Sequence, residues 1–161
     1  MSTLSIKDVT EALRDQLKAY SGLVYAKDSG YAGNDATVLV QLNKFPFFNI
    51  VPINQLVNRV PNMSYSELRR NTFEVQIQFA TFGVKADTAI TGTAAKKGIM
   101  DFSKDLLDGI FSDETLGSVV AGFTEEDQEI NIDFLTIDDP EGERYIAGGE
   151  MTVKFYKDIE V

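Results

Sequence analysis

The sequence predicts an α+β protein: a single domain spanning residues 1–161, with a mostly antiparallel sheet and two main helices packed on one of its faces. Two segments carry apolar residues at three- and four-residue steps, which is the period of an amphipathic helix. Other segments alternate apolar and polar residues, as a strand with one buried face does. No repeat, linker or low-complexity tract divides the 161 residues, and that length suits one domain.

The first helix is predicted over residues 5–20. Ser5 is placed to cap this helix, and Asp8 stands three residues later at the capping-box position. The opposite face mixes acids and bases, a pattern typical of a helix that faces water rather than a membrane surface. The apolar stripe consists of Ile6, Val9, Leu13, Leu17 and Tyr20.

Residues 21–61 show weaker patterns. We expect a short strand at 23–26, then a turn rich in glycine, asparagine and aspartate, and a second strand at 37–42. The segment 45–61 is apolar but contains three prolines, which cannot donate to a sheet ladder. Any strand within this segment is therefore predicted to be short or to lie at a sheet edge.

The clearest strand is predicted at residues 73–80, where apolar and polar side chains alternate. Its polar side is suited to water or to a partner, and not to an apolar core. The apolar positions are Phe73, Val75, Ile77 and Phe79, and the polar positions between them are Glu74, Gln76 and Gln78.

Residues 83–94 lack periodicity and are rich in glycine, alanine and threonine, so we predict a long loop. Loops of this length inside a domain are usually functional or mobile. We expect this loop to dock a partner and to become ordered when the partner binds. The residues expected to make that contact are Val84, Lys85, Asp87, Thr88 and Ile90.

The second main helix and a hairpin complete the predicted fold. The helix ends near Phe111, and a short strand at 119–123 and an acidic turn follow it. A strand at 130–137 is predicted to pair with an antiparallel return strand at 143–158. Two glycines, Gly148 and Gly149, indicate a bulge or a close approach of the backbone there. The core-facing residues are Ala95, Ile99, Phe102, Leu106 and Ile110 on the helix, and Met151, Val153 and Phe155 on the return strand.

The negative charge is concentrated in the second half of the chain. The formal net charge is −10, yet residues 101–143 hold fourteen acids and only one base, Lys104. One interpretation is a solvated acidic face that keeps the protein soluble. The other is a functional surface that repels polyanions or meets a near-neutral or basic edge of a neighbour.

The composition removes most common catalytic groups. Without cysteine and histidine, the chain has no thiol nucleophile, no imidazole base and no ligand of the usual zinc sites. Phosphate-binding glycine loops, calcium-loop spacing and the G-x-S-x-G elbow are missing, and the 25 acids single out no carboxylate pair. We therefore predict no catalytic residue, cofactor, metal site or enzymatic activity. No apolar run is long enough to cross a bilayer, so no membrane association is expected.

Arg69 and Arg70 form the one compact basic pair in the first half of the sequence. Two arginines do not make a DNA site. They either pair with acids of the same chain or lie at a subunit boundary, where they would meet the acidic second half of a neighbouring copy. The hypothesised subunit interface consists of Arg69, Arg70, Glu74, Gln76 and Gln78.

The order of elements resembles that of the tail terminator (tail-completion) proteins of long-tailed bacteriophages. The resemblance runs from Ser5 to Tyr156. It depends most on the end of the second helix, followed by Leu116 and Gly117, and on the final strand after the turn at residues 142–144. Ser118 stands where the family often has a second glycine, which leaves other neck, minor tail and head–tail joining proteins open as alternatives.

The resemblance implies a structural protein of the virion that catalyses no reaction. It implies a homohexameric ring at the head-proximal end of the tail, assembled in the host cytoplasm, that caps the tail tube and ends its polymerisation. The implied partners are further copies of the chain, the tail tube protein and a neck or head-completion protein. DNA would pass through without specific binding.

An acidic lumen would fit such a ring, because it lets DNA slide without sticking. We hypothesise that Glu125, Glu126, Asp127 and Glu129 line it, and that lysine at these positions would slow genome ejection. From a different class, a small ligand-binding or enzymatic α+β domain stays open, and a deep pocket with convergent carboxylates would favour it.

Overall fold

A computed structural model of the chain confirms the α+β fold and describes residues 4–59, 68–124, 130–139 and 142–160. The helices are α1 (Ile6–Ala19), the 3₁₀ helix η1 (Ser21–Ser29), α2 (Ala36–Gln41), α3 (Ala86–Ile90) and α4 (Ile99–Phe111). The strands are β1 (Gly30–Ala32), β2 (Phe47–Arg59), β3 (Leu68–Gly83), β4 (Gly122–Phe123), β5 (Ile132–Ile137) and β6 (Tyr145–Glu160).

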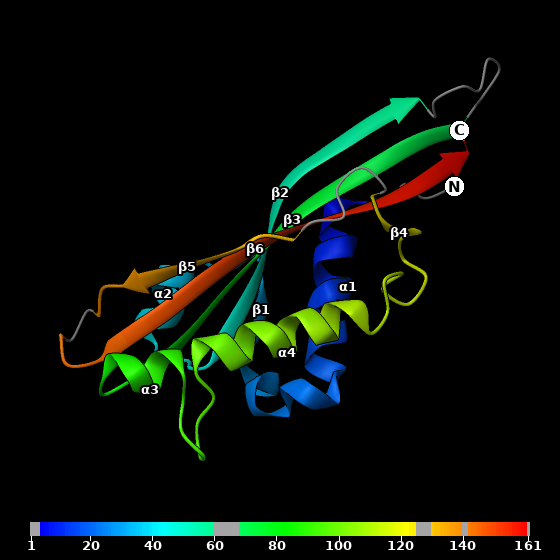
Figure 1. Ribbon diagram of the computed structural model, residues 1–161. Helices are drawn as coiled ribbons and strands as arrows, with labels where there is room; N and C mark the ends of the chain where they lie inside the picture. The colour runs from blue at the N-terminus through cyan, green and yellow to red at the C-terminus, as the bar shows by residue number, and fades with distance from the viewer. Residues whose placement is uncertain (1–3, 60–67, 125–129, 140–141, 161) are drawn as a thin grey trace.

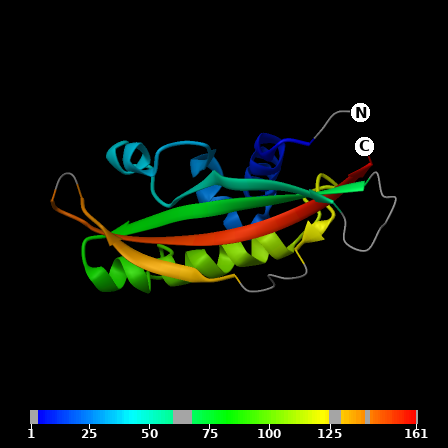
Figure 2. The same cartoon turned by 90° about the horizontal axis from the view of Figure 1, so that it is seen from above.

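One mixed sheet organises these elements. Its strands lie in the order β1-β2-β3-β6, and the far edge of β6 pairs with β5 along one part and with β4 along another. Only the β1–β2 pairing is parallel among the described strand pairs. In Figure 1, β2, β3 and β6 run on together past the helices to the upper right, and Figure 2 shows them side by side with β5 along one margin.

The main core lies between one face of the sheet and the helices α1, η1, α3 and α4. The predicted helix stripes and strand stripes meet there, so the two main helices do pack on one face as predicted. Ala95 is the exception, because it precedes α4 and is exposed rather than core-facing. Figure 1 shows α1 and α4 crossing beneath the strands. The fully buried members include Leu13, Leu17, Phe73, Val75, Ile77, Phe79, Phe102, Leu106 and Phe155.

Among the described residues, only one end of the opposite face of the sheet is covered by a helix. There α2 places Leu39 and Val40 against Phe47, Ala80 and Ile146, which form a second, smaller apolar cluster. Because side chains alternate between the faces of a strand, the residues that follow Ala80 toward the start of β3 in steps of two share this face. We call the remainder of it the uncovered face, and it carries Arg70, Thr72, Glu74, Gln76 and Gln78 on β3.

The cap of α1 is the predicted one. The Ser5 hydroxyl accepts a hydrogen bond from the Asp8 backbone N–H at 3.2 Å, and the Asp8 carboxylate accepts one from the Ser5 backbone N–H at 3.0 Å. These hydrogen bonds from Ser5 lower the pKa of Asp8 below its ordinary value. The helix therefore begins where two otherwise free backbone donors are satisfied.

Two strand predictions in the first half of the chain are wrong. Residues 23–26 lie in the 3₁₀ helix η1, where Leu23 and Ala26 are buried. Residues 37–42 fall largely in α2, whose N-cap is Asp35; its carboxylate accepts a hydrogen bond from the Thr37 N–H at 2.9 Å. The branched residues favoured a strand, but this local cap and the burial of the α2 face stabilise a helix.

The segment 45–61 is more regular than predicted. It contains β2, a strand of 13 residues, so the strand is not short. β1 pairs only with residues 48–50, and the rest of β2 lies at the sheet edge, which is the other alternative predicted. A bulge lies between Pro52 and Asn54, where the register against β3 shifts by one residue. An edge strand tolerates proline because the donors on its outer side need no ladder partner.

The predicted long loop at 83–94 is also wrong, because residues 86–90 form α3. The helix packs on β3 and β6 through the buried Ala89, whose carbonyl accepts a hydrogen bond from the Thr81 hydroxyl at 2.7 Å. A turn closed by an isolated bridge between Gly92 and Lys97 then leads into α4, which begins at Ile99. The small residues here permit close packing and do not mark an irregular loop.

The terminal hairpin is confirmed, with β5 antiparallel to β6. Of the two alternatives for its glycines, close approach is the observed one, since the β3–β6 register runs without a shift. A Cβ atom added at Gly149 would lie 2.5 Å from the Phe79 ring, and one at Gly148 would lie 2.6 Å from Ile137. Both glycines make room for a neighbouring side chain.

Candidate functional site

The uncovered face gathers most of the hypothesised interface residues. Arg70, Glu74, Gln76 and Gln78 lie on β3 at alternate positions and so point to the same side of the sheet. Arg69 is one residue out of step and belongs to the other side. The shared face predicted for Glu74, Gln76 and Gln78 is thus confirmed and also includes Arg70, while the role of all five residues in an interface stays a prediction.

Arg70 pairs within its own chain. Its Nε and Nη2 atoms donate to the two carboxylate oxygens of Asp158 at 2.8 and 2.9 Å, in a bidentate pair across β3 and β6. The guanidinium also lies 4.5 Å from the centre of the Tyr156 ring. Of the two alternatives for this arginine, pairing with an acid of the same chain is therefore observed.

Amide side chains order the middle of the uncovered face. The Gln78 amide donates to the Gln76 side-chain oxygen at 3.2 Å, and the Asn49 amide donates to the Gln78 oxygen at 3.4 Å. Asn49 is fully buried and also bonds both backbone groups of Asn34, at 2.6 and 3.1 Å. Hydrogen bonds thus connect the side chains of Asn49, Gln78 and Gln76 in the middle of this face.

The Arg70–Asp158 pair gives a pH-dependent contribution to stability. The hydrogen bonds from Arg70 lower the pKa of Asp158 below its ordinary value of 3.8. The pair therefore contributes fully to stability at pH values above 3.8, and this contribution is lost as the pH falls through the lowered pKa of Asp158. We expect Asp158→Asn to reduce the free energy of unfolding by about 0.5–1 kcal/mol at neutral pH, because the pair is partly exposed.

Denaturant titrations of both proteins at several pH values would check this expectation. The difference between them should shrink as the pH falls below about 4. Asp133→Asn is a matched control on an exposed strand position. A difference for Asp158→Asn that is equally large at the acid end would contradict the assigned cause.

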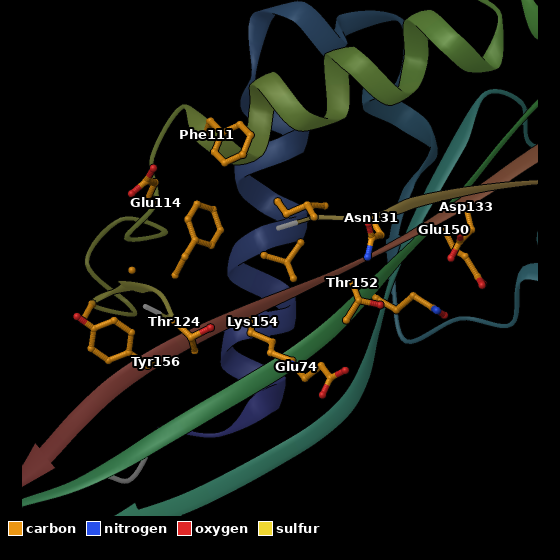
Figure 3. A pocket seen from close by; sticks show the side chains of 16 residues that line it. Glu74, Phe111, Glu114, Thr124, Asn131, Asp133, Glu150, Thr152, Lys154 and Tyr156 are labelled. Atoms are coloured by element: carbon orange, nitrogen blue, oxygen red, sulfur yellow. The ribbon is translucent and has the colours of Figure 1, made fainter. Parts of the chain in front are cut away.

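A hollow of about 730 Å³ lies beside the uncovered face, where no described strand pairs with β6 between β4 and β5. Four carboxylates and one lysine contribute to its lining, as Figure 3 shows, with Asp133 and Glu150 together at one end and Glu114 at the other. Among the described residues, no three acids gather closely enough to hold a metal ion. The lining residues of polar or charged type are Glu74, Gln76, Glu114, Thr124, Asn131, Asp133, Glu150, Thr152, Lys154 and Tyr156.

The other hypothesised residues are separated from this face. The predicted docking segment lies at the end of β3, about 43 Å along the strand from Arg70 at 3.3 Å per residue. Within that segment Val84, Lys85 and Asp87 are exposed, while Thr88 and Ile90 are partly buried in α3. The acidic residues proposed for a lumen, Glu125, Glu126, Asp127 and Glu129, lie outside the described residues.

The outer edges of the sheet carry exposed apolar residues that sequence reasoning missed. On β2, β1 pairs only with residues 48–50, and beyond the bulge Leu56 and Val57 are 49% and 54% exposed. On β5, Phe134 and Leu135 are 55% and 42% exposed. Adjacent apolar residues in a strand point to opposite faces, so apolar side chains are exposed on both sides of the sheet at these two edges.

Comparison with known proteins adds no family. No protein-family model matches the chain, and no curated protein matches it. No helix within the described part of the chain is long and apolar enough to span a membrane. The function therefore has to be argued from the uncovered face and the two edges.

Proposed function

We propose that the protein is a structural component of a phage virion that forms a ring at the head-proximal end of the tail. The ring caps the tail tube, ends its polymerisation and offers a docking surface to the neck. The placement in a tail rests on the sequence resemblance over residues 5–156. The ring rests on the geometry of the sheet.

The proposed ring is supported mainly by one observation, the two open edges of the sheet. An exposed edge strand with apolar side chains is a template for association, and natural proteins leave one open where a partner covers it. Here two such edges, on β2 and β5, lie on opposite sides of one sheet. Different surfaces that meet head to tail generate a closed ring when the rotation between copies closes.

The uncovered face supports a surface that works by contact. Its Gln76 and Gln78 side chains are held by hydrogen bonds, which lowers the entropy lost when a partner binds. Glu74 stands directly opposite Lys154 across β3 and β6, so charges of both signs are interspersed there. Such a mixed polar face suits repeated contact with a symmetric partner such as a tube end.

The alternative of a ligand-binding or enzymatic domain has one feature in its favour, the hollow beside β6. Its acids are spread along the hollow, as Figure 3 shows, and do not converge on a point. General acid–base chemistry needs carboxylates placed together around a substrate atom. The hollow therefore supports this alternative less than the edges support assembly.

Electron microscopy of phage tails assembled with and without the protein tests the proposal. We expect tubes of uniform length in its presence and overlong tubes in its absence. Adding the purified protein to growing tubes should stop their elongation, and this separates a terminator from a neck or minor tail component. Tube lengths that do not respond to the protein in either experiment would refute the proposed function.

A further inference from the structure

Each of the two open edges includes a stretch of six strand residues. Beyond the bulge, residues 54–59 of β2 have no strand partner on their outer side among the described residues. On the other side of the sheet, β5 spans Ile132–Ile137 and pairs with β6 alone within the described part of the chain. Each edge therefore offers backbone donors and acceptors at alternate residues over a stretch of six.

The chain directions of the two edges are compatible. β2 runs antiparallel to β3, and β3 runs antiparallel to β6, so β2 and β6 point the same way. β5 runs antiparallel to β6 and hence to β2. If the sheet of one copy continued into the sheet of the next, β2 of the first would meet β5 of the second as an antiparallel pair, in which hydrogen bonds are perpendicular to the strands.

The apolar residues of the two edges match in a single register. Leu56 of β2 and Leu135 of β5 both belong to the uncovered face, while Val57 and Phe134 both point to the helix side. In an antiparallel pair that sets Leu56 opposite Leu135, Val57 falls opposite Phe134. A shift by one residue would put these side chains on opposite faces, and a shift by two would separate both pairs.

The neighbouring positions of this register are compatible too. Asn58 falls opposite Asp133, which already faces Glu150 across β5 and β6, a pairing of like charges. An amide can donate to the Asp133 carboxylate and so stabilise its charged form. Gln55 falls opposite Thr136, and both side chains can donate and accept hydrogen bonds.

A symmetric pairing of two β2 edges fits less well. In an antiparallel β2–β2 pair with matched faces, either Leu56 or Val57 lies opposite its own copy, and the other lies opposite an asparagine or glutamine. Such a pair makes one apolar cross-strand contact, whereas the β2–β5 pair makes two. It also leaves the β5 edge, with Phe134 and Leu135, exposed.

We propose that the chain associates head to tail, with β2 of one copy pairing with β5 of the next through Leu56–Leu135 and Val57–Phe134. The inference rests on the proposed ring and names the seam between its subunits. Leu56 is level with Tyr156 on β6, whereas Leu135 is level with Gly148, eight residues along the strand. Successive copies are therefore staggered by about 26 Å along the strands.

Cysteine cross-linking tests the seam without background, because the chain contains no cysteine. Leu56→Cys and Leu135→Cys are made as separate variants and mixed at the concentration where the unmodified protein assembles, as judged by native mass spectrometry. A short thiol cross-linker should join one copy of each variant, and should join neither variant to itself. The doubly substituted chain should give a ladder of cross-linked oligomers.

Two controls keep the test decisive. Val24→Cys on η1 is more accessible, at 70% exposure against 49% for Leu56, and should still give no product with Leu135→Cys. Leu56→Asp should weaken self-association at least tenfold while its circular dichroism spectrum matches that of the parent, because the side chain is half exposed.

Three outcomes would each overturn the seam. The first is a cross-link that joins Leu56→Cys to itself, and the second is an assembled protein that gives no mixed product. The third is a protein that stays monomeric at every soluble concentration.

The outcomes for the seam and for the proposed function are separate. A ring that shortens tails but gives no Leu56–Leu135 product would overturn the seam and leave the function standing. The expected cross-link in a protein that has no effect on tail length would support the seam and refute the function.

Discussion

Replacing Phe102 by alanine is expected to lower the free energy of unfolding by about 3–5 kcal/mol. The Phe102 ring is fully buried and makes edge-to-face contacts with Phe79 on β3 and Tyr25 on η1, with ring centres 5.9 and 5.8 Å apart. It therefore joins α4 to the sheet and to η1. Truncation removes these contacts and leaves a cavity that the surrounding strands cannot fill by moving.

Chemical denaturation followed by circular dichroism measures this cost. Met100→Ala is a matched control on the same helix, because Met100 is 56% exposed, and its effect should stay within about 0.5 kcal/mol. Phe102→Leu keeps much of the buried volume and should cost less than the alanine variant. A loss for Phe102→Ala no larger than that of the Met100 variant would contradict the packing described for α4.

The core strands could be predicted from sequence because each buries a single face. Three pairs of predicted core residues turn out to be direct neighbours across β3 and β6: Phe73 with Phe155, Val75 with Val153, and Ile77 with Met151. Apolar and polar residues alternate along each of these strands because helices cover one face of the sheet and the other face is polar. The polar face with Glu74, Gln76 and Gln78 was predictable for the same reason.

β2 could not be predicted because its burial changes along its length. Phe47 packs in the small cluster under α2, while its neighbour Phe48 packs in the main core, so both faces are buried at this end. At the other end Leu56 and Val57 are exposed on both faces. Neither half has a period of two, and the prolines further weakened the strand pattern.

The two open edges of the sheet could not be predicted from the sequence either. Whether a strand lies at an edge depends on the order of strands, and periodicity carries no information about that order. A signal was present in the adjacent apolar residues Leu56–Val57 and Phe134–Leu135, which break strict alternation in exposed strands. It becomes interpretable only after the topology shows that nothing in the described chain covers them.

Replacing Asp139 by alanine is expected to cost about 3 kcal/mol, because it removes the carboxylate partner of a largely buried arginine. The Asp139 side chain is 2% exposed, and the Arg144 side chain is 15% exposed. The Asp139 carboxylate accepts hydrogen bonds from Nε and Nη2 of Arg144, and from the backbone N–H groups of Glu143 and Arg144. It thus fixes the turn that sets β5 against β6.

Arg144 extends this anchor across the same end of the sheet to the connection between α2 and β2. Its guanidinium donates to the side-chain oxygen of Asn43 and lies 5.5 and 5.6 Å from the ring centres of Phe45 and Phe82. Loss of the Asp139 carboxylate therefore leaves the positive charge in an aromatic setting with less compensation. The turn between β5 and β6 should loosen together with the contact to the α2–β2 connection.

Hydrogen exchange and thermal unfolding of the Asp139→Ala variant measure both effects. Asp138→Ala is the matched control, since Asp138 is the preceding residue in the same turn and is exposed. We expect amides of β5 to lose protection in Asp139→Ala and to keep it in Asp138→Ala. Because β5 provides one side of the proposed seam, Asp139→Ala should also weaken self-association under conditions where it stays folded. Equal stability of the two variants would show that the turn does not depend on this carboxylate.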